Sequence, residues 1–235
     1  MARDWAEEAT IIRWTATLAA FLIAANLALG TLALLRYPAY WSQPTAGRFF
    51  IEPAAFLCAY AVALLILIDS RPNPGALRIA SICGLLTGAL EVLNVALENV
   101  APSLWHGAAL SITFMLLPFL LWTIAAAVGA RRTGTWRNGL LAAVLSAALC
   151  MLLSVAAGFV LELFLAPPSA AAVAAWPEFL RSRWSDPRAF AMANTFDSAF
   201  THLLFAPIVA AIFGSIASAV TLVAHRQSIT NPQPS

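Results

Sequence analysis

The sequence predicts an all-α integral membrane protein, a six-helix transmembrane bundle with both termini in the cytoplasm. Of its 235 residues, 61% are hydrophobic and only 10% are charged, a composition far from that of water-soluble domains. Six apolar windows of about 20 residues, the length that crosses ~30 Å of hydrocarbon, follow one another along the chain. Among the short connections, arginines are more numerous in the second and fourth, taken together, than in the first and third. This moderate bias predicts the orientation, because the long fifth connection, with Arg181, Arg183 and Arg188, is less constrained by charge.

The six predicted spans cover residues 14–35, 50–68, 77–98, 106–130, 138–165 and 190–224. The first is too long for the apolar part of a signal peptide, and the acidic residues Asp4, Glu7 and Glu8 precede it, so we expect it to remain as a helix. The fifth and sixth are longer than a bilayer requires, and we expect them to tilt or to project beyond it. No long repeat or low-complexity tract divides the chain, which predicts a single transmembrane domain over residues 1–235.

Arginine counts in the short connections orient the bundle. Arg131, Arg132 and Arg137 fill the connection between the fourth and fifth spans, and Arg71 and Arg78 flank the one between the second and third. We expect these connections and both termini to face the cytoplasm.

Composition also bounds the compartment and the partners. The formal net charge of +2 is too small for a nucleic-acid footprint, so we expect a lipid bilayer and no nucleic acid. All basic residues are arginine and alanine is abundant, a bias typical of GC-rich bacterial genomes, which predicts a bacterial inner membrane. On the outer side, the loop 166–189 is long enough to lay a short interfacial helix, around 178–184, over the mouth of the bundle.

One face of the third span is polar. A helix turns by about 100° per residue, which places a single broad stripe along the segment GLLTGALEVLNVALENV. The stripe consists of Gly84, Thr87, Gly88, Glu91, Asn94, Val95, Glu98 and Asn99. The spacing Gly84-x-x-x-Gly88 allows a neighbouring helix to approach closely. The opposite face is leucine and alanine, so the stripe faces protein or water and the other face meets lipid.

Further polar residues fall in the same, outer leaflet on the fifth and sixth spans. Together with the stripe they make the candidate ligand- or proton-binding residues Glu91, Asn94, Glu98, Glu162, Asn194, Asp197, Thr201 and His202. A charged side chain at the bilayer centre costs at least ~2.5 kcal/mol, so such groups require partners, water or protonation. Glu91 and Asp197 lie about two turns inside the membrane and would carry the charge. Glu98 and Glu162 can equally be interfacial side chains that extend to the headgroups.

In this interpretation Asn94, Asn194 and Thr201 would form hydrogen bonds with a ligand. His202 would mark the floor of the pocket, although a packed neutral imidazole explains it as well.

These residues favour a small inner-membrane transporter, or a solute- or ion-binding subunit of one, with an acidic pocket for a small cation, a proton or a polar solute. A second interpretation is a noncatalytic membrane subunit or assembly factor of a larger complex, whose polar stripes pair with one another or with partner helices. A third is a metal-dependent membrane enzyme with Glu91, Glu162, Asp197 and His202 as ligands, although no Glu-x-x-His or His-x-x-x-His pair is present. No catalytic residue and no cofactor is indicated, which makes an enzyme the less expected class.

The first span repeats small residues at Ala16, Ala20 and Ala24. With this spacing, the plan of six spans and a polar pocket under outer capping loops resembles the substrate-binding subunits of energy-coupling-factor vitamin transporters. The resemblance concerns architecture, so it implies a transport role and carries over no residue. The substrate, the direction of transport and any association with other subunits or with copies of the chain are left open.

Overall fold

A computed structural model of the protein describes residues 2–70, 72–100 and 108–230, and these residues form helices and connections with no strand. The six long helices are α1 (Ala2–Arg36), α2 (Ala46–Asp69), α3 (Pro74–Val100), α5 (Ala108–Thr133), α6 (Trp136–Val160) and α9 (Pro187–Thr230). Each contains a segment that is long and apolar enough to cross a membrane. The prediction of an all-α fold with six such helices is therefore confirmed.

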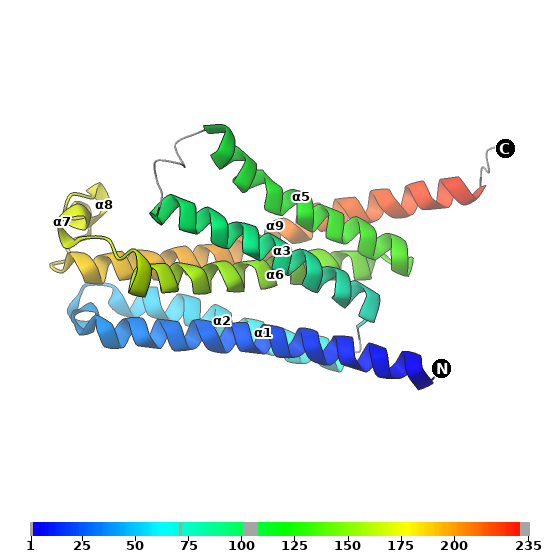
Figure 1. The fold of residues 1–235 in the computed structure, drawn as a ribbon, viewed down its shortest axis with the longest axis horizontal. Coiled ribbons are helices and arrows are strands. Elements are labelled where there is room, and N and C mark those ends of the chain that lie inside the picture. Colours follow the sequence, from blue (N-terminus) through cyan, green and yellow to red (C-terminus); the bar gives the residue numbers. More distant parts are fainter. Residues whose placement is uncertain (1, 71, 101–107, 231–235) are drawn as a thin grey trace.

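The helices extend beyond the predicted spans at most ends. α1 begins at Ala2 and α9 runs to Thr230, because charged turns that continue a helix into water are not counted by a hydropathy window. At ~1.5 Å per residue the 44 residues of α9 span about 66 Å, roughly twice the hydrocarbon thickness. The last turns of α9 accordingly project past the rest of the bundle (Figure 1). The predicted start of the fourth span, at residue 106, lies outside the described residues.

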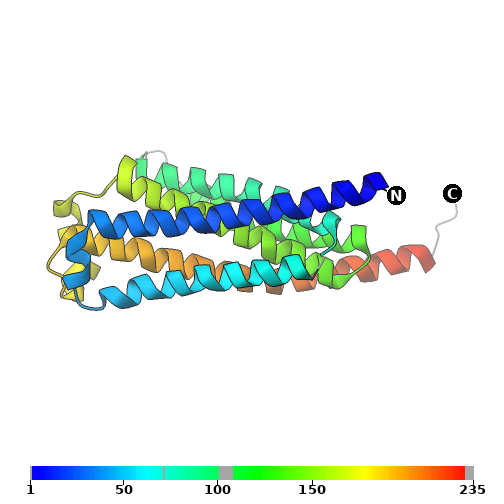
Figure 2. The ribbon, with the colours of Figure 1, turned by 90° about the horizontal axis from the view of Figure 1, so that it is seen from below.

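The most enclosed helix is α6, which packs against α1, α3, α5 and α9. α1 and α2 lie together along one side of the bundle (Figures 1 and 2). Small side chains explain the central place of α6, because Ser146 and Cys150 are fully buried and let neighbouring backbones approach.

Glycines on neighbouring helices make this contact close. A Cβ atom added at Gly84 of α3 would lie 2.9 Å from the carbonyl oxygen of Ser146. One added at Gly214 of α9 would lie 2.6 Å from the Cβ atom of Ala143. At these two positions there is no room for a methyl group between α6 and the neighbouring helix.

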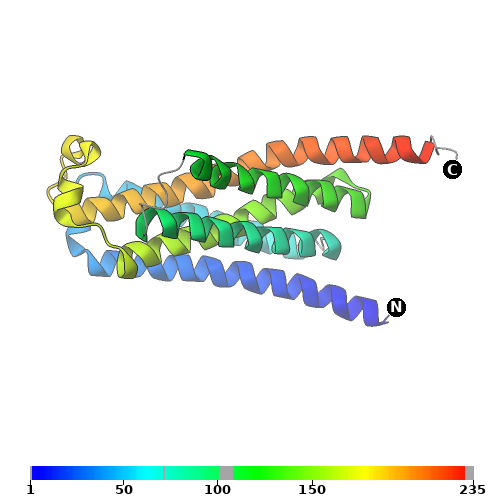
Figure 3. The same ribbon diagram turned by 45° about the horizontal axis from the view of Figure 1, so that its top comes forward.

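Three short helices gather at one end of the bundle: η1 (Pro38–Ser42), α7 (Ala170–Ala174) and α8 (Pro177–Ser182). We call this the capped end. The first residues of α1 and the last residues of α9 lie at the opposite end, which we call the terminal end (Figures 1 and 3). α8 lies in the loop where the sequence suggested a short helix, whereas η1 and α7 were not expected.

Aromatic packing holds the cap in place. Tyr40 is fully buried, its hydroxyl donates to the Ala46 carbonyl oxygen at 2.9 Å, and its ring centroid lies 5.7 Å from that of Trp184. Burial raises the pKa of the Tyr40 phenol above its ordinary value. The Ser185 amide donates to Oε1 of Gln43 at 2.8 Å, which links the connection after α1 to the segment before α9.

Candidate functional site

Two adjoining cavities, both open to the surface, lie between helices in the part of the bundle toward the capped end. One, of about 370 Å³, lies between α3, α6 and α9 and is called the acidic cavity below. The other, of about 480 Å³, lies between α3, α5 and α9 and is called the aromatic cavity. Glu91, Asn94 and His202 line both cavities, so these three side chains lie where the two spaces meet.

Polar side chains from three parts of the chain line the acidic cavity. They are Glu91, Asn94, Glu98, Asn99, Ser154, Glu162, Asn194, Thr195, Ser198 and His202. No arginine is among its lining residues, and Trp176, just before α8, lines it as well. The lining therefore has three carboxylates and no fixed positive charge.

Glu91 is half-buried on α3, and its one described hydrogen bond is local. Nδ2 of Asn94, one turn further on, donates to Oε2 of Glu91 at 3.3 Å, which is long for a hydrogen bond. Oδ1 of the same Asn94 is buried and has no hydrogen-bond partner among the described residues. A neutral amide at this distance leaves the carboxylate charge largely uncompensated and leaves one amide acceptor available.

His202 comes from the second turn beyond Asn194 on α9. Its Nδ1 lies 2.7 Å from the carbonyl oxygen of Ser198, and a carbonyl oxygen can only accept, so Nδ1 carries a proton and donates it. In the neutral imidazole Nε2 is then the acceptor. His202 can therefore accept a hydrogen bond from a cationic ligand at the junction of the cavities.

Glu162 reaches the acidic cavity from one turn of π-helix, η2 (Leu161–Leu165), which follows α6 directly. The Ala166 amide donates to the Leu161 carbonyl oxygen, five residues earlier, at 2.8 Å. This widened turn changes the direction in which residues of the last turn project, and turns of this kind are frequent at functional sites. The fifth predicted span, 138–165, is thus an α-helix that ends in a π-turn.

The structure brings most of the predicted site residues together. Six of the eight line the acidic cavity: Glu91, Asn94, Glu98, Glu162, Asn194 and His202. Thr201 lines the aromatic cavity.

Asp197 lines neither of these two cavities. It is exposed and close enough to Arg48 of α2 for their charges to interact. The reason is the helical rotation of about 100° per residue, which directs Asp197 away from its neighbour Ser198 and toward α2. The sequence predicts that Asp197 lies at the same depth as the other site residues, but depth alone does not determine the direction in which its side chain points.

The sequence interpretation missed the residues that α5 contributes. Phe119 and Trp122 line the aromatic cavity, together with Phe205 and Met151, and Trp122 is only 2% exposed. The pair Phe119 and Trp122, one turn apart and beside Pro118, was the available signal. In an apolar span such residues look the same whether they face lipid or a cavity.

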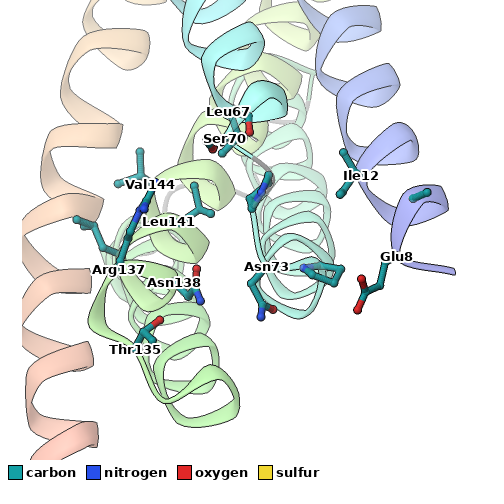
Figure 4. Close-up of a pocket in the computed structure, with 14 residues that line it drawn as sticks. Glu8, Ile12, Leu67, Ser70, Asn73, Thr135, Arg137, Asn138, Leu141 and Val144 are labelled. Atoms are coloured by element: carbon teal, nitrogen blue, oxygen red, sulfur yellow. Dashed lines mark hydrogen bonds between the residues drawn. The ribbon is translucent and has the colours of Figure 1, made fainter. Parts of the chain in front are cut away.

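A larger cavity, of about 1070 Å³, lies at the terminal end and is lined by none of the predicted residues (Figure 4). Glu8 of α1 and Arg137 of α6 lie on opposite sides of it. Charged side chains at helix ends are ordinary where helices leave the membrane, whereas carboxylates within a span require a reason. We therefore place the candidate site at the two smaller cavities, despite the greater volume of this one.

The chemistry of the two cavities suits a small ligand with positive charge or with hydrogen-bond donors. Carboxylates and amide oxygens accept from ammonium groups and hold protons. Among the residues that the structure describes, no three His, Cys, Asp or Glu side chains are grouped to hold a metal ion, so a metal-dependent enzyme has no candidate ligand set there. Comparison of the chain with protein-family models, with curated proteins and with solved structures found no match.

Proposed function

We propose that this chain is a multi-pass protein of a bacterial inner membrane that binds a small cation, a proton or a small polar solute, as a transporter or as the binding subunit of one. Its six long apolar helices cross the bilayer, both termini face the cytoplasm, and the capped end faces outward. The acidic cavity then receives its ligand in the outer half of the membrane.

The observation that carries this proposal is that two cavities share Glu91, Asn94 and His202. A carboxylate at this depth is costly unless it has water, a partner or a proton, and the long hydrogen bond from Asn94 at 3.3 Å is a weak partner. Space beside Glu91 in both cavities allows a cation or water to fill that role.

The orientation is supported by the arginines of the α5–α6 connection. Arg131 and Arg132 end α5, Arg137 begins α6, and these ends lie on the side of the bundle that carries the described termini (Figure 1). Positive charge in short connections marks the cytoplasmic side. Reporter fusions after residue 134 and at the C-terminus should report cytoplasm, and fusions near residues 43 and 175 should report the outside. The reverse pattern would put the acidic cavity in the cytoplasmic half.

The alternative of a noncatalytic subunit or assembly factor expects the polar stripe of α3 to be packed without space. Gly84 and Gly88 do pack in this way against α6. Glu91, Asn94 and Glu98 line a cavity instead. The part of the stripe that carries the carboxylates therefore favours ligand binding.

Thermal unfolding of the detergent-purified protein, with and without ligands, tests the proposal. The panel comprises ammonium, methylammonium, potassium and acetate at equal ionic strength, together with a series of pH values. A ligand at a hundred times its Kd adds about 2.7 kcal/mol to the free energy of unfolding, which corresponds to a rise in Tm of roughly 5–10 °C. We expect such a rise with at least one cation or on acidification, and none with acetate.

Two variants give the test its specificity. Glu91→Gln should remove the response while the protein still folds, because the amide keeps the shape and loses the charge. Asp197→Asn is the matched control, since Asp197 is exposed and lines neither cavity, and it should retain the response. A wild-type protein that responds to no cation and to no pH change would contradict a cation or proton site in the acidic cavity, as would an equal loss of response in both variants.

A further inference from the structure

The aromatic cavity has two chemically different walls. Where it meets the acidic cavity it is polar, with Glu91, Asn94 and His202. Apart from the hydroxyl of Thr201, the rest of its lining is apolar: Pro118, Phe119, Trp122, Met151, Phe205, Ala206 and Val209. A ligand that occupied this space and contacted Glu91 would meet a carboxylate at one end and aromatic rings at the other.

Trp122 is the feature of this wall that points to a ligand. Its side chain is 2% exposed, and its Nε1–H is buried without a hydrogen-bond partner among the described residues. Leaving a buried donor unpaired costs about 1–3 kcal/mol, and neither the apolar side chains of that wall nor the Thr201 hydroxyl accepts from it. An acceptor atom on a ligand would satisfy the indole.

The rings of this wall are held in position by one another. The centroids of Phe119 and Trp122 lie 5.4 Å apart at an interplanar angle of 81°, the edge-to-face arrangement that aromatic pairs prefer. Phe119 also packs on Phe213 of α9, with centroids 6.2 Å apart. The surface is therefore preorganised, which reduces the entropy lost when an apolar group packs against it.

Charge and size limit the ligand further. Glu91, Glu98 and Glu162 line the acidic cavity without an arginine, which excludes an anion, and aromatic faces also attract cations. An apolar cavity of about 150 Å³ is enough for a benzene ring. The aromatic cavity, of about 480 Å³, has room for a ring and a short chain.

We propose that the ligand is an organic ammonium ion with a flat apolar group that carries an oxygen acceptor. The ammonium group lies at Glu91 where the cavities meet, the apolar group packs on Phe119 and Trp122, and the oxygen accepts from Nε1 of Trp122. This inference rests on the proposed function, because it names the substrate class of the same site.

Calorimetric titration with a graded series of amines tests it on the detergent-purified protein. Ethylammonium has the charge alone, phenethylammonium adds the ring, and tyramine adds a phenolic oxygen at the far end of that ring. Burial of the ring should tighten binding by about tenfold or more, and the hydrogen bond to the indole by a further fivefold or so.

Two variants separate the aromatic cavity from nonspecific partition into detergent. Val209→Phe fills part of the aromatic cavity, and it should remove the advantage of phenethylammonium over ethylammonium while ethylammonium binds as before. Trp122→Phe keeps a ring and removes the N–H, so it should abolish only the advantage of tyramine over phenethylammonium. A merely structural role of Trp122 would weaken all three amines equally.

The possible failures are distinguishable. Equal affinity for all three amines, or a preference for the ring that survives Val209→Phe, would overturn the inference and leave the acidic cavity as a cation site. Absence of binding by every amine, with no response to inorganic cations or to pH, would overturn the proposed function as well.

Discussion

The two halves of the α3–α6 contact use one polar stripe in opposite ways. Toward the terminal end, Gly84 and Gly88 let α3 lie against the backbone of α6, so that a Cβ atom at Gly84 would be 2.9 Å from the Ser146 carbonyl oxygen. Toward the capped end, Glu91 and Glu98 line a cavity of about 370 Å³. On the facing helix, a Cβ atom added at Gly158 would meet nothing within 4 Å.

The difference shows that small residues and polar residues on one stripe have separate tasks. The packed half brings the helices together with a fixed spacing and direction. In the half toward the capped end the helices keep that spacing, but side chains such as Glu91 and Glu98 leave the space between the helices unfilled. Close packing at one end of a helix pair is thus compatible with a cavity at the other.

The largest expected effect comes from filling the packed half. Gly84→Leu and Gly88→Leu should each destabilise the fold by about 3 kcal/mol or more, at or above the upper end of typical overpacking costs, because the Leu149 or Leu153 side chain and the α6 backbone stand in the way. Accumulation of folded protein in membranes, read by size-exclusion chromatography, should fall sharply.

Leucine-to-isoleucine changes on the exposed apolar side of α3 are the matched controls. Leu86 and Leu93 are exposed on the opposite face of α3, so Leu86→Ile and Leu93→Ile should accumulate almost as the wild type does. Equal tolerance at all four positions would show that the glycine half faces lipid or water and is not packed on α6.

A smaller effect, of opposite sign in the two halves, is expected from adding one methyl group. Gly84→Ala should cost about 2 kcal/mol, because the new Cβ meets backbone. Gly158→Ala enters open space, and alanine is the better helix former, so the free energy of unfolding should rise by up to about 1 kcal/mol. Chemical denaturation of both variants in the same detergent measures these free energies of unfolding. A destabilised Gly158→Ala would contradict the presence of open space beside α6 at this position.

The smallest expected change in stability comes from neutralising the cavity carboxylate. Glu91→Gln should alter the free energy of unfolding by less than about 1 kcal/mol, or raise it, because a charge that is costly inside the membrane is removed. If Glu91 were instead part of a buried ion-pair network, neutralising it would lower the free energy of unfolding by about 3–5 kcal/mol. Denaturation midpoints of Glu91→Gln and the wild type without ligand distinguish these outcomes, and a large loss would make Glu91 a packing residue like Gly84.

Much of the helical layout could be predicted because its signals are local. The six long apolar helices follow from hydropathy, and the stripe of α3 follows from the helical period. Six of the eight predicted site residues line one cavity, since polar residues of similar depth on neighbouring helices turn toward one another and away from lipid. The first turns of α1 and the last turns of α9 lie outside the predicted spans, although the sixth span was expected to tilt or project, because hydropathy does not register charged turns that continue a helix.

The residues that were misplaced or missed depend on contacts between helices. Asp197 and Ser198 are neighbours in sequence, yet the rotation of about 100° between them sends one toward Arg48 and the other into the acidic cavity. Trp122 is indistinguishable from a lipid-facing residue until α5 is placed against α6 and α9.

The amino-acid sequence by itself determined that this chain folds into apolar helices of membrane-spanning length with a polar face on the third, because hydropathy and helical period belong to each segment separately. Only the tertiary structure decided that Glu91, Glu162 and His202 line one cavity and that Trp122 stands beside it. The rotation of each helix and its neighbours are set by which small residues on α3, α6 and α9 meet. A spacing such as Gly84-x-x-x-Gly88 indicates that a helix can be approached closely, but not which helix approaches it.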